Sequence, residues 1–308
     1  MAGVTDRAFR PLCKRFGADV IFTEFASTDA LIHGNEATKQ MIAYTPEEQP
    51  VVCQLFGNDP KKFAAAAKIL EHMGFAGVDI NFGCPAYKVV SHGGGVMLMR
   101  EPMLCRTLVE ATCNAVSIPI SVKIRSSIQN NETGETKTAL DLVRAIRDLP
   151  VASLMIHGRS YEKPFDGEPN VAMIRAVRDA FPGTLIANGG IHTPEDAKTM
   201  LDATGADGLG IARGSWGSPW IFKQIADYLT TGTYRELSWE EKREVILDHA
   251  RLALAHKDAH GIIELRKHLA WYVKGIPGAS ALRQQLVRVK TIEDITSVLQ
   301  SAPVLAHI

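Results

Sequence analysis

A repeated alternation of short apolar runs with amphipathic helical stretches constrains the fold more than any other feature of this chain. Seven runs rich in β-branched and aromatic residues are strand candidates: 19–25, 51–56, 77–82, 119–125, 153–158, 184–190 and 207–213. The helix-like stretches between them, several of which start with Pro or an Asp/Thr cap, are 60–73, 102–116, 138–148, 169–181 and 194–204. Apolar strands separated by helices indicate parallel βαβ units. So many repeats predict an α/β fold, either a (β/α)8 TIM barrel, which we favour, or an open doubly wound sheet.

Seven strand candidates are one fewer than a closed barrel contains. The first clear element, 5–16, reads as a helix with no strand before it. We therefore expect residues 1–308 to begin at the carboxyl edge of barrel strand one, with that strand missing or truncated. After residue 228 the strand pattern stops. The predicted organisation is a barrel domain at 1–229, a linker at 230–238 and a small all-helical domain at 238–308, broken at 275–278.

Composition excludes several classes of protein. The hydrophobic fraction is 46%, yet no apolar run reaches the roughly 18 residues of a membrane span. The first ten residues lack the apolar region of a secretory signal. Five cysteines without a CxxC pair fit neither a disulfide framework nor a zinc site. We expect a cytoplasmic monomer with reduced thiols, no metal and no membrane contact.

The net charge is zero, so any nucleic-acid surface must be local. Segment 265–290 has no acidic residue, and its six cations are Arg266, Lys267, Lys274, Arg283, Arg288 and Lys290. Trp271 and Tyr272 are interleaved with them. RNA needs phosphate contacts and aromatic stacking surfaces, which this segment offers. A solvated helix face would show the same charges, and this reading stays open.

Polar residues gather where the predicted strands end, which is where barrels carry their chemistry. They are Gln54, Asn81, Cys84, Lys123, Arg125, His157, Arg159, Asn188 and Arg213. Any one of them could simply cap a loop, but the whole set indicates a site. Gly189-Gly190 and Arg213-Gly214 follow the last two strands, where barrels bind phosphate through backbone N–H groups. A mononucleotide phosphate is therefore expected there.

Cys84 stands apart from the other cysteines. Gly83 and Pro85 place it in a tight loop over the predicted barrel mouth, whereas Cys13, Cys53, Cys105 and Cys113 read as small core residues. A thiol with an ordinary pKa of roughly 8.5 is mostly protonated at neutral pH and can donate a proton. The glycine-rich stretch 88–99 that follows is either a lid over substrate or a flexible connection.

These motifs together resemble the tRNA-dihydrouridine synthase family. MAGVTDRAFR, QLFG, DINFGCPAYKV, SVKIR, IHGR, ANGGI and ARGSWGSPWIF match its landmarks along the barrel, and RKHLAWYVKGIPGA at 266–279 is similar to the helical domain of the bacterial B-type subgroup. The family also carries a leader with the first strand before MAGVTD, and it usually has Asp at the position of Gly190.

The resemblance implies FMN, reduced by NADPH, which passes a hydride from N5 to C6 of a tRNA uridine, while Cys84 gives the proton to C5. It implies that the cofactor is bound by Met1, Ala2, Gln54, Lys123, His157, Asn188, Gly189, Gly190, Ala212 and Arg213. It implies substrate contacts from Asn81, Arg125 and Arg159, and from Arg266, Lys267 and Lys274 in the helical domain. A lysine beside the flavin pyrimidine would stabilise the anionic reduced form.

Two other functions remain open at this point. A dihydroorotate-dehydrogenase-like FMN barrel would act on a free pyrimidine, and the acid-free segment 265–290 argues against it. A non-catalytic tRNA-binding or folding factor would contain no flavin. Flavin content separates that factor from the two enzymes, and turnover of tRNA against dihydroorotate separates the enzymes from each other.

Overall fold

The computed structural model of this protein describes residues 1–130, 133–164 and 166–302. The chain folds into two compact units, each of which packs mainly against itself. The barrel unit comprises Met1–Gly3 and Val20–Ala212, and the helical unit comprises Val4–Asp19 and Arg213–Ile308. Residues 303–308, at the end of the predicted helical domain, lie outside the described residues.

The barrel unit is built on a parallel sheet with seven strand positions. In sheet order these are β1 (Ile21–Phe22) with β2 (Ala26–Ser27), then β3 (Val51–Phe56), β4 (Gly77–Phe82), β5 (Ile120–Arg125), β8 (Ser153–His157), β9 (Thr184–Asn188) and β10 (Gly208–Gly210). All seven predicted strands are present, and sheet order follows chain order. The prediction of one strand at 19–25 is wrong in detail, because β1 and β2 pair separately with β3.

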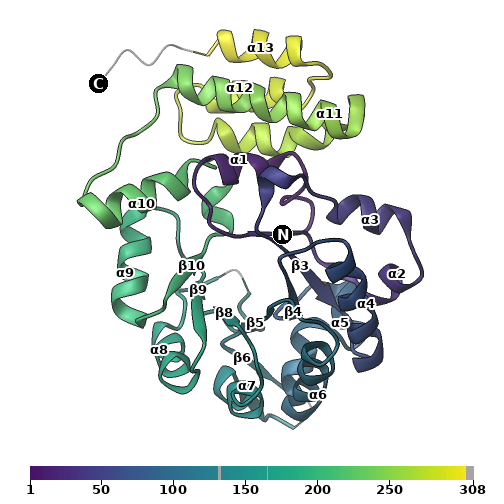
Figure 1. The fold of residues 1–308 in the computed structure, drawn as a ribbon. Coiled ribbons are helices and arrows are strands. Elements are labelled where there is room, and N and C mark those ends of the chain that lie inside the picture. Colours follow the sequence, from purple (N-terminus) through teal and green to yellow (C-terminus); the bar gives the residue numbers. More distant parts are fainter. Residues whose placement is uncertain (131–132, 165, 303–308) are drawn as a thin grey trace. The chain divides into compact units, whose positions relative to one another are not determined.

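Helices follow the strands on the outside of this sheet (Figure 1). They are α2 (Thr28–Ile32), α3 (Glu36–Ile42), α4 (Pro60–His72), α5 (Tyr87–Val90), α6 (Pro102–Cys113), α7 (Ala139–Ile146), α8 (Val171–Ala180) and α9 (Pro194–Thr204). Each of the larger helices packs against the next along the chain. Parallel strands in chain order with a ring of helices outside form the predicted TIM-barrel arrangement. Within the described residues β1 and β10 are the two end strands of the sheet.

The helix starts were readable from sequence because local capping fixes them. Asp59 accepts hydrogen bonds from the backbone of Lys61 and Lys62 at 2.8 and 3.3 Å, directly before Pro60. Thr193 and Asp196 form a capping box at α9. A hairpin of β6 (Ser127–Gln129) and β7 (Thr136–Thr138) was not predicted.

The two faces of the sheet differ in polarity. Leu55, Val78, Ile80, Val122 and Ile124, which belong to the apolar alternate positions, are fully buried. The other alternate positions in the same strands carry polar side chains: Gln54, Asp79, Asn81, Ser121, Lys123 and Arg125. Because successive strand residues point to opposite faces, one face packs against the helices and the other is polar.

The helical unit contains α1 (Phe9–Arg15), α10 (Ile221–Thr231), α11 (Trp239–Tyr272), α12 (Ala279–Leu286) and α13 (Ile292–Gln300). The predicted break at 275–278 lies between α11 and α12. The segment called α11 is itself two helices, because Lys257 and Asp258 have non-helical backbone angles. A side chain at Gly261 would place its Cβ 2.1 Å from the carbonyl oxygen of Ala253, so only glycine permits the two halves to approach this closely.

Helix α1 belongs to the helical unit by its packing. The ring of Phe9 lies 5.5 Å from that of His249 and 5.0 Å from that of His268, centroid to centroid. Trp220, directly before α10, lies in the core of the same unit. Sequence reasoning had placed both helices in the 1–229 domain; that boundary, and the linker at 230–238, stay predictions. No helix of the described residues is long and apolar enough to cross a membrane.

Candidate active site at the carboxyl edge of the sheet

Strand register brings the predicted site residues of the barrel unit into neighbouring positions. Asn81 of β4 is paired with Lys123 of β5. Two residues further along β5, Arg125 is paired with His157 of β8, and His157 is paired with Asn188 of β9. Parallel strands end at the same edge, so five candidates from four strands meet there.

A chain of buried hydrogen bonds connects strands β3, β4 and β5. The Nε2 of Gln54 donates to Asp79 at 2.6 Å, and Nδ2 of Asn81 donates to Oε1 of Gln54 at 2.8 Å. The hydroxyl of Ser121 donates to the other carboxylate oxygen of Asp79 at 2.6 Å. All four side chains are at most 9% exposed. The edge is therefore a fixed polar network with little access for water.

The loop that carries Cys84 is attached to this network. The Oδ1 of Asn81 accepts from the backbone N–H of Gly83 at 3.0 Å and of Cys84 at 2.8 Å. From the next strand, Nε of Arg125 donates to the carbonyl of Gly83 at 2.8 Å. The thiol itself is half-buried, and the N–H of Ala86 lies 3.5 Å from its sulfur.

Partial burial raises the pKa of the Cys84 thiol, against the opposing effects of Lys123, Arg125 and the chain's amino terminus. The thiol therefore keeps its proton at neutral pH and can act as an acid. Cys13, Cys53 and Cys105 are buried, as predicted for core residues. Cys113 is only half-buried, and burial raises its pKa to about 11.

The stretch after Cys84 has more structure than the sequence indicated. Residues 88–99 include part of α5 and most of η2 (Gly95–Arg100), with Val89 and Val96 buried. The N–H of Val96 donates to the carbonyl of Cys84 at 3.2 Å. A Cβ on Gly95 would lie 2.6 Å from that same carbonyl oxygen. The stretch is packed against the loop that it follows, and the choice between a lid over substrate and a flexible connection stays a prediction.

Lys123 is the cation at the centre of this edge. Burial, followed by the nearby Arg125, lowers its pKa to about 8, while Asp79 and Cys84 act in the opposite direction. Its ammonium group has no hydrogen-bond partner among the described residues. A partly desolvated cation in this position suits an electron-rich ring system.

The last strands of the barrel unit end in backbone suited to close contact with a ligand. Gly189 and Gly190 have φ values of +110° and +74°, and a Cβ on Gly189 would lie 2.6 Å from Cδ2 of His157. The Nδ2 of Asn188 donates to the carbonyl of Gly210 at 2.5 Å, which ties β9 to β10. Met1 is half-buried and Ala2 is exposed. Ala212 ends the barrel unit and Arg213 begins the helical unit, and both are half-buried.

Arg125 and Arg159, the two predicted substrate contacts of the barrel unit, donate hydrogen bonds to backbone carbonyl groups. Besides Gly83, Arg125 donates from Nη1 to the carbonyl of Ser160 at 3.1 Å. Nε of Arg159 donates to the carbonyl of Gly167 at 2.7 Å. Burial lowers the pKa of Arg125 to about 10, so it stays charged at neutral pH. Their predicted contacts to the target base stay predictions.

The cations of segment 265–290 do not form one uniform set. Arg266 is half-buried and donates to the carbonyls of Val289 at 2.7 Å and Arg288 at 3.3 Å, so its guanidinium fastens the chain beyond α12. Lys267 is half-buried. The other four, all exposed, are Lys274, Arg283, Arg288 and Lys290.

Of the stacking surface expected at Trp271 and Tyr272, the part at Tyr272 is wrong, whereas Trp271 is half-buried and its part stays a prediction. Tyr272 is 4% exposed, and its hydroxyl lies 3.1 Å from Nδ1 of His249. Trp271 stacks on Trp216, with centroids 4.4 Å apart and planes 13° apart. The helix position of Tyr272 places its ring in the unit's core, which the sequence pattern alone did not distinguish from an exposed face.

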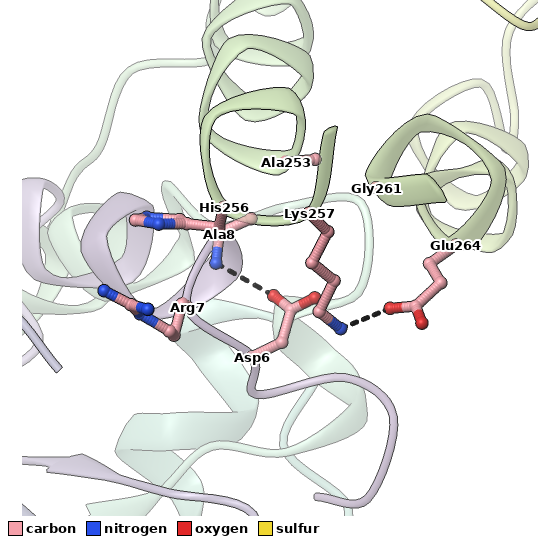
Figure 2. Close-up of a pocket in the computed structure, with 8 residues that line it drawn as sticks. All are labelled: Asp6, Arg7, Ala8, Ala253, His256, Lys257, Gly261 and Glu264. Carbon is pink, nitrogen blue, oxygen red and sulfur yellow. Dashed lines mark hydrogen bonds and ion pairs between the residues drawn. The ribbon is translucent and has the colours of Figure 1, made fainter. Parts of the chain in front are cut away.

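A small cavity lies in the helical unit beside the break in α11 (Figure 2). With about 10 Å³ of space it holds no more than one water molecule. Asp6 caps α1 through the N–H of Phe9 at 3.0 Å, and Lys257 pairs with Glu264, whereas the buried Nε of Arg7 has no hydrogen-bond partner among the described residues. The cavity is a structural void and not a ligand site.

Sequence reasoning missed Asp79 and Ser121. Both lie in strands that were read as apolar, and neither is at a strand end. A carboxylate within the otherwise apolar run GVDINF was the signal, because a fully buried Asp needs hydrogen-bond partners. Which side chains would supply them depended on strand register.

Comparison with known protein families agrees with this edge of polar groups. The sequence profile of a family described as dihydrouridine synthase matches residues 1–306. The chain belongs to the dihydrouridine synthase family. It is therefore an oxidoreductase of a flavin-dependent family that reduces uridine in tRNA.

Curated relatives carry the same description. The chain is 34% identical to tRNA-dihydrouridine synthase B of Pseudomonas aeruginosa over 293 residues, 94% of this chain and 87% of the relative. It is 36% identical to tRNA-dihydrouridine synthase B of Shewanella oneidensis over 275 residues, 89% and 84% of the two chains. A probable tRNA-dihydrouridine synthase of Rickettsia prowazekii is 37% identical over 286 residues, 92% and 86% of the two chains.

Among solved structures, histamine dehydrogenase from Rhizobium sp. 4-9 superimposes with a TM-score of 0.55 at 12% sequence identity. The match covers 97% of this chain and 60% of that one. At this identity the likeness concerns the fold alone. In the part of the chain that the structure describes, no group of three or more His, Cys, Asp or Glu residues could hold a metal ion.

Proposed function

We propose that this protein reduces the C5–C6 bond of specific uridines in tRNA to 5,6-dihydrouridine, using FMN and NADPH, with Cys84 as the proton donor to C5. The observation that carries the proposal is the position of Cys84. Its protonated thiol lies on a loop that Asn81 and Arg125 hold at the same edge as Lys123. Family membership supplies the reaction class.

The residues at this edge fit a flavin mononucleotide. Lys123 offers an ammonium without a hydrogen-bond partner among the described residues, and the neighbouring amide of Gln54 is fixed by Asp79. Gly189 and Gly190 have positive φ and carry no Cβ, so a ligand phosphate could approach their backbone N–H groups closely. Asn188, Ala212, Arg213, His157, Met1 and Ala2 would complete the cofactor contacts. FMN, when bound, supplies the hydride that reaches C6.

The chain's own groups would divide the remaining work. Lys123 would stabilise negative charge that develops on the ring system, because a partly buried cation acts in a low dielectric. Asn81, Arg125 and Arg159 would orient the uracil. Cys84 would deliver its proton to C5, and the raised pKa of its thiol keeps that proton available at pH 7.

The helical unit would supply phosphate contacts to the tRNA. Flipping a base out of its stack costs a few kcal/mol, which distant phosphate contacts can offset. Lys267 and Lys274 are the proposed contacts, and Arg283, Arg288 and Lys290 extend the same charge. Arg266, also a proposed contact, has hydrogen bonds within the unit that give it a structural role as well.

Three measurements on the purified protein test the proposal. We expect a yellow protein whose released flavin is FMN by chromatography. We expect NADPH to reduce that flavin without tRNA, and dihydrouridine to appear by mass spectrometry in tRNA lacking it. A protein without flavin contradicts the cofactor, and turnover of dihydroorotate in place of tRNA contradicts the substrate.

A further inference from the structure

We infer that Asp79 is a positioning residue whose carboxylate fixes the hydrogen-bond direction of Gln54 and Asn81, and thereby holds the loop that carries Cys84. We call Asp79, Gln54 and Asn81 the amide relay. The inference concerns the loop itself; its consequence for turnover rests on the function proposed above.

The N–H groups of the Cys84 loop decide which atom of the Asn81 amide faces the loop and which faces Gln54. The N–H groups of Gly83 and Cys84 can only donate, and both are within 3.0 Å of one atom of the Asn81 amide. That atom must be the oxygen, because an amide nitrogen cannot accept. The nitrogen of Asn81 therefore faces Gln54, at 2.8 Å from Oε1.

The far end of the relay needs an acceptor. Since the oxygen of Gln54 accepts from Asn81, its nitrogen must donate in the other direction. The atom that it meets is a carboxylate oxygen of Asp79, at 2.6 Å. Ser121 donates to the second oxygen, so both oxygens of Asp79 accept. The loop N–H groups at one end and the Asp79 carboxylate at the other therefore require the same orientation of the two amides. In that orientation each amide oxygen accepts a hydrogen bond and each amide nitrogen donates one.

Burial makes the relay depend on each member. Asp79 is fully buried, and Asn81 and Gln54 are 3% and 9% exposed. Water has little access to replace a lost partner, and a buried donor without one is costly. If Asp79 offered no acceptor, the buried amino group of Gln54 would lose its partner, and the contact that fixes Gln54 in its orientation toward Asn81 would be lost.

The relay supports a specific part of the Cys84 loop. Arg125 holds the carbonyl of Gly83, and Val96 holds the carbonyl of Cys84. The N–H groups of the same two residues are held by Asn81 alone among the described residues. Loss of the relay should therefore loosen these N–H groups while the carbonyl contacts persist.

Hydrogen–deuterium exchange of the flavin-free protein measures this directly. The peptide 82–88 contains the N–H groups of Gly83 and Cys84. Asp79→Leu removes the acceptor at similar size, and we expect about 3- to 10-fold faster exchange in this peptide, the change that one lost hydrogen bond gives. Asp79→Asn keeps an oxygen for Gln54 and can donate to Ser121, so it should retain native exchange. Ser121→Ala breaks the other bond of the same carboxylate and is the matched control.

Two outcomes would overturn the inference: native exchange of the peptide in Asp79→Leu, or equally fast exchange in Ser121→Ala. If Asp79→Leu does not fold, Gln54→Met interrupts the relay at its middle and should give the same local increase. None of these measurements uses flavin or tRNA, so they stand whether or not the proposed reaction is found. Where turnover is found, the Leu variant should lower kcat and the Asn variant should restore most of it.

Discussion

At the carboxyl edge of the barrel unit the buried side chains of Gln54, Asp79, Asn81 and Ser121 bond to one another, whereas in the helical unit the buried histidines lie among aromatic rings. Asp79 and Gln54 have partners for their buried groups. His268, at 1% exposure, has no hydrogen-bond partner for either ring nitrogen among the described residues, and it packs against Phe9 and Trp271. The first arrangement stabilises charge and can support chemistry. The second excludes charge, so it supports packing only while the rings stay neutral.

The largest effect should come from the proposed acid of the barrel unit. Cys84→Ala should lower tRNA turnover by about 10²- to 10⁴-fold, the usual range for loss of a general acid, because no other thiol is placed at this edge among the described residues. Flavin content and flavin reduction by NADPH should be unchanged. Cys113→Ala, a half-buried thiol on α6, is the control. Normal turnover in Cys84→Ala would remove the acid from the mechanism.

The next effect concerns acid stability of the helical unit. Burial lowers the pKa of His249 to about 3 and that of His268 to about 2, below the unfolded value of 6.5. The unfolded state therefore binds protons first as pH falls below about 6.5, and the free energy of unfolding decreases by about 1.4 kcal/mol per pH unit for each histidine. Between pH 6 and 5 most carboxylates remain ionised, so the histidines dominate.

This pH dependence can be assigned to one unit. All four tryptophans, at 216, 220, 239 and 271, lie in the helical unit, so their fluorescence during urea unfolding reports on it. His268→Phe loses no hydrogen bond and should halve the pH slope, whereas His192→Gln, an exposed site in the barrel unit, should leave it unchanged. An unaltered slope in His268→Phe would show that the buried rings accept protons.

A smaller effect should show whether Asp79 acts on the charge of Lys123 or only positions its hydrogen-bond partners. With a pKa of about 8, Lys123 loses its ammonium charge above that pH, so flavin reduction by NADPH should fall by up to about 10-fold per pH unit there. Asp79 opposes the lowered pKa, and Asp79→Asn should shift the fall to lower pH. Stopped-flow reduction between pH 6 and 10 measures this. If the pH dependence of flavin reduction is the same in Asp79→Asn as in the unchanged protein, Asp79 has no effect on the Lys123 charge and acts only as a positioning residue.

The smallest effect concerns the cations of the helical unit. Lys267→Gln with Lys274→Gln should reduce the slope of log affinity for tRNA against log salt by about 1.4 to 1.8, from two lost phosphate contacts. Flavin reduction should be unaffected. Lys198→Gln with Lys223→Gln removes the same charge from lysines that pair with Asp202 and Asp227. Equal slopes in the two double variants would mean that segment 265–290 is a solvated face.

The sequence by itself determined the order and type of the elements. Strand β3 and helix α9 begin and end at the predicted residues, because apolar runs and capping residues act over a few positions. It also placed Cys84 and Lys123 at strand ends, since in a parallel barrel every strand ends at the same edge. The family resemblance rested on these same local motifs and is confirmed.

Only the tertiary structure decided which polar groups are partners. Asp79 meets Gln54 and Ser121 because β3, β4 and β5 pair in one register, and register involves residues 25 and 42 positions apart. Likewise Tyr272 is buried beside His249, and Trp271 stacks on Trp216, partners that are distant in sequence. The local sequence pattern shows where polar and apolar side chains alternate along the chain. Which of them become buried, paired or exposed depends on contacts that no short stretch of sequence contains.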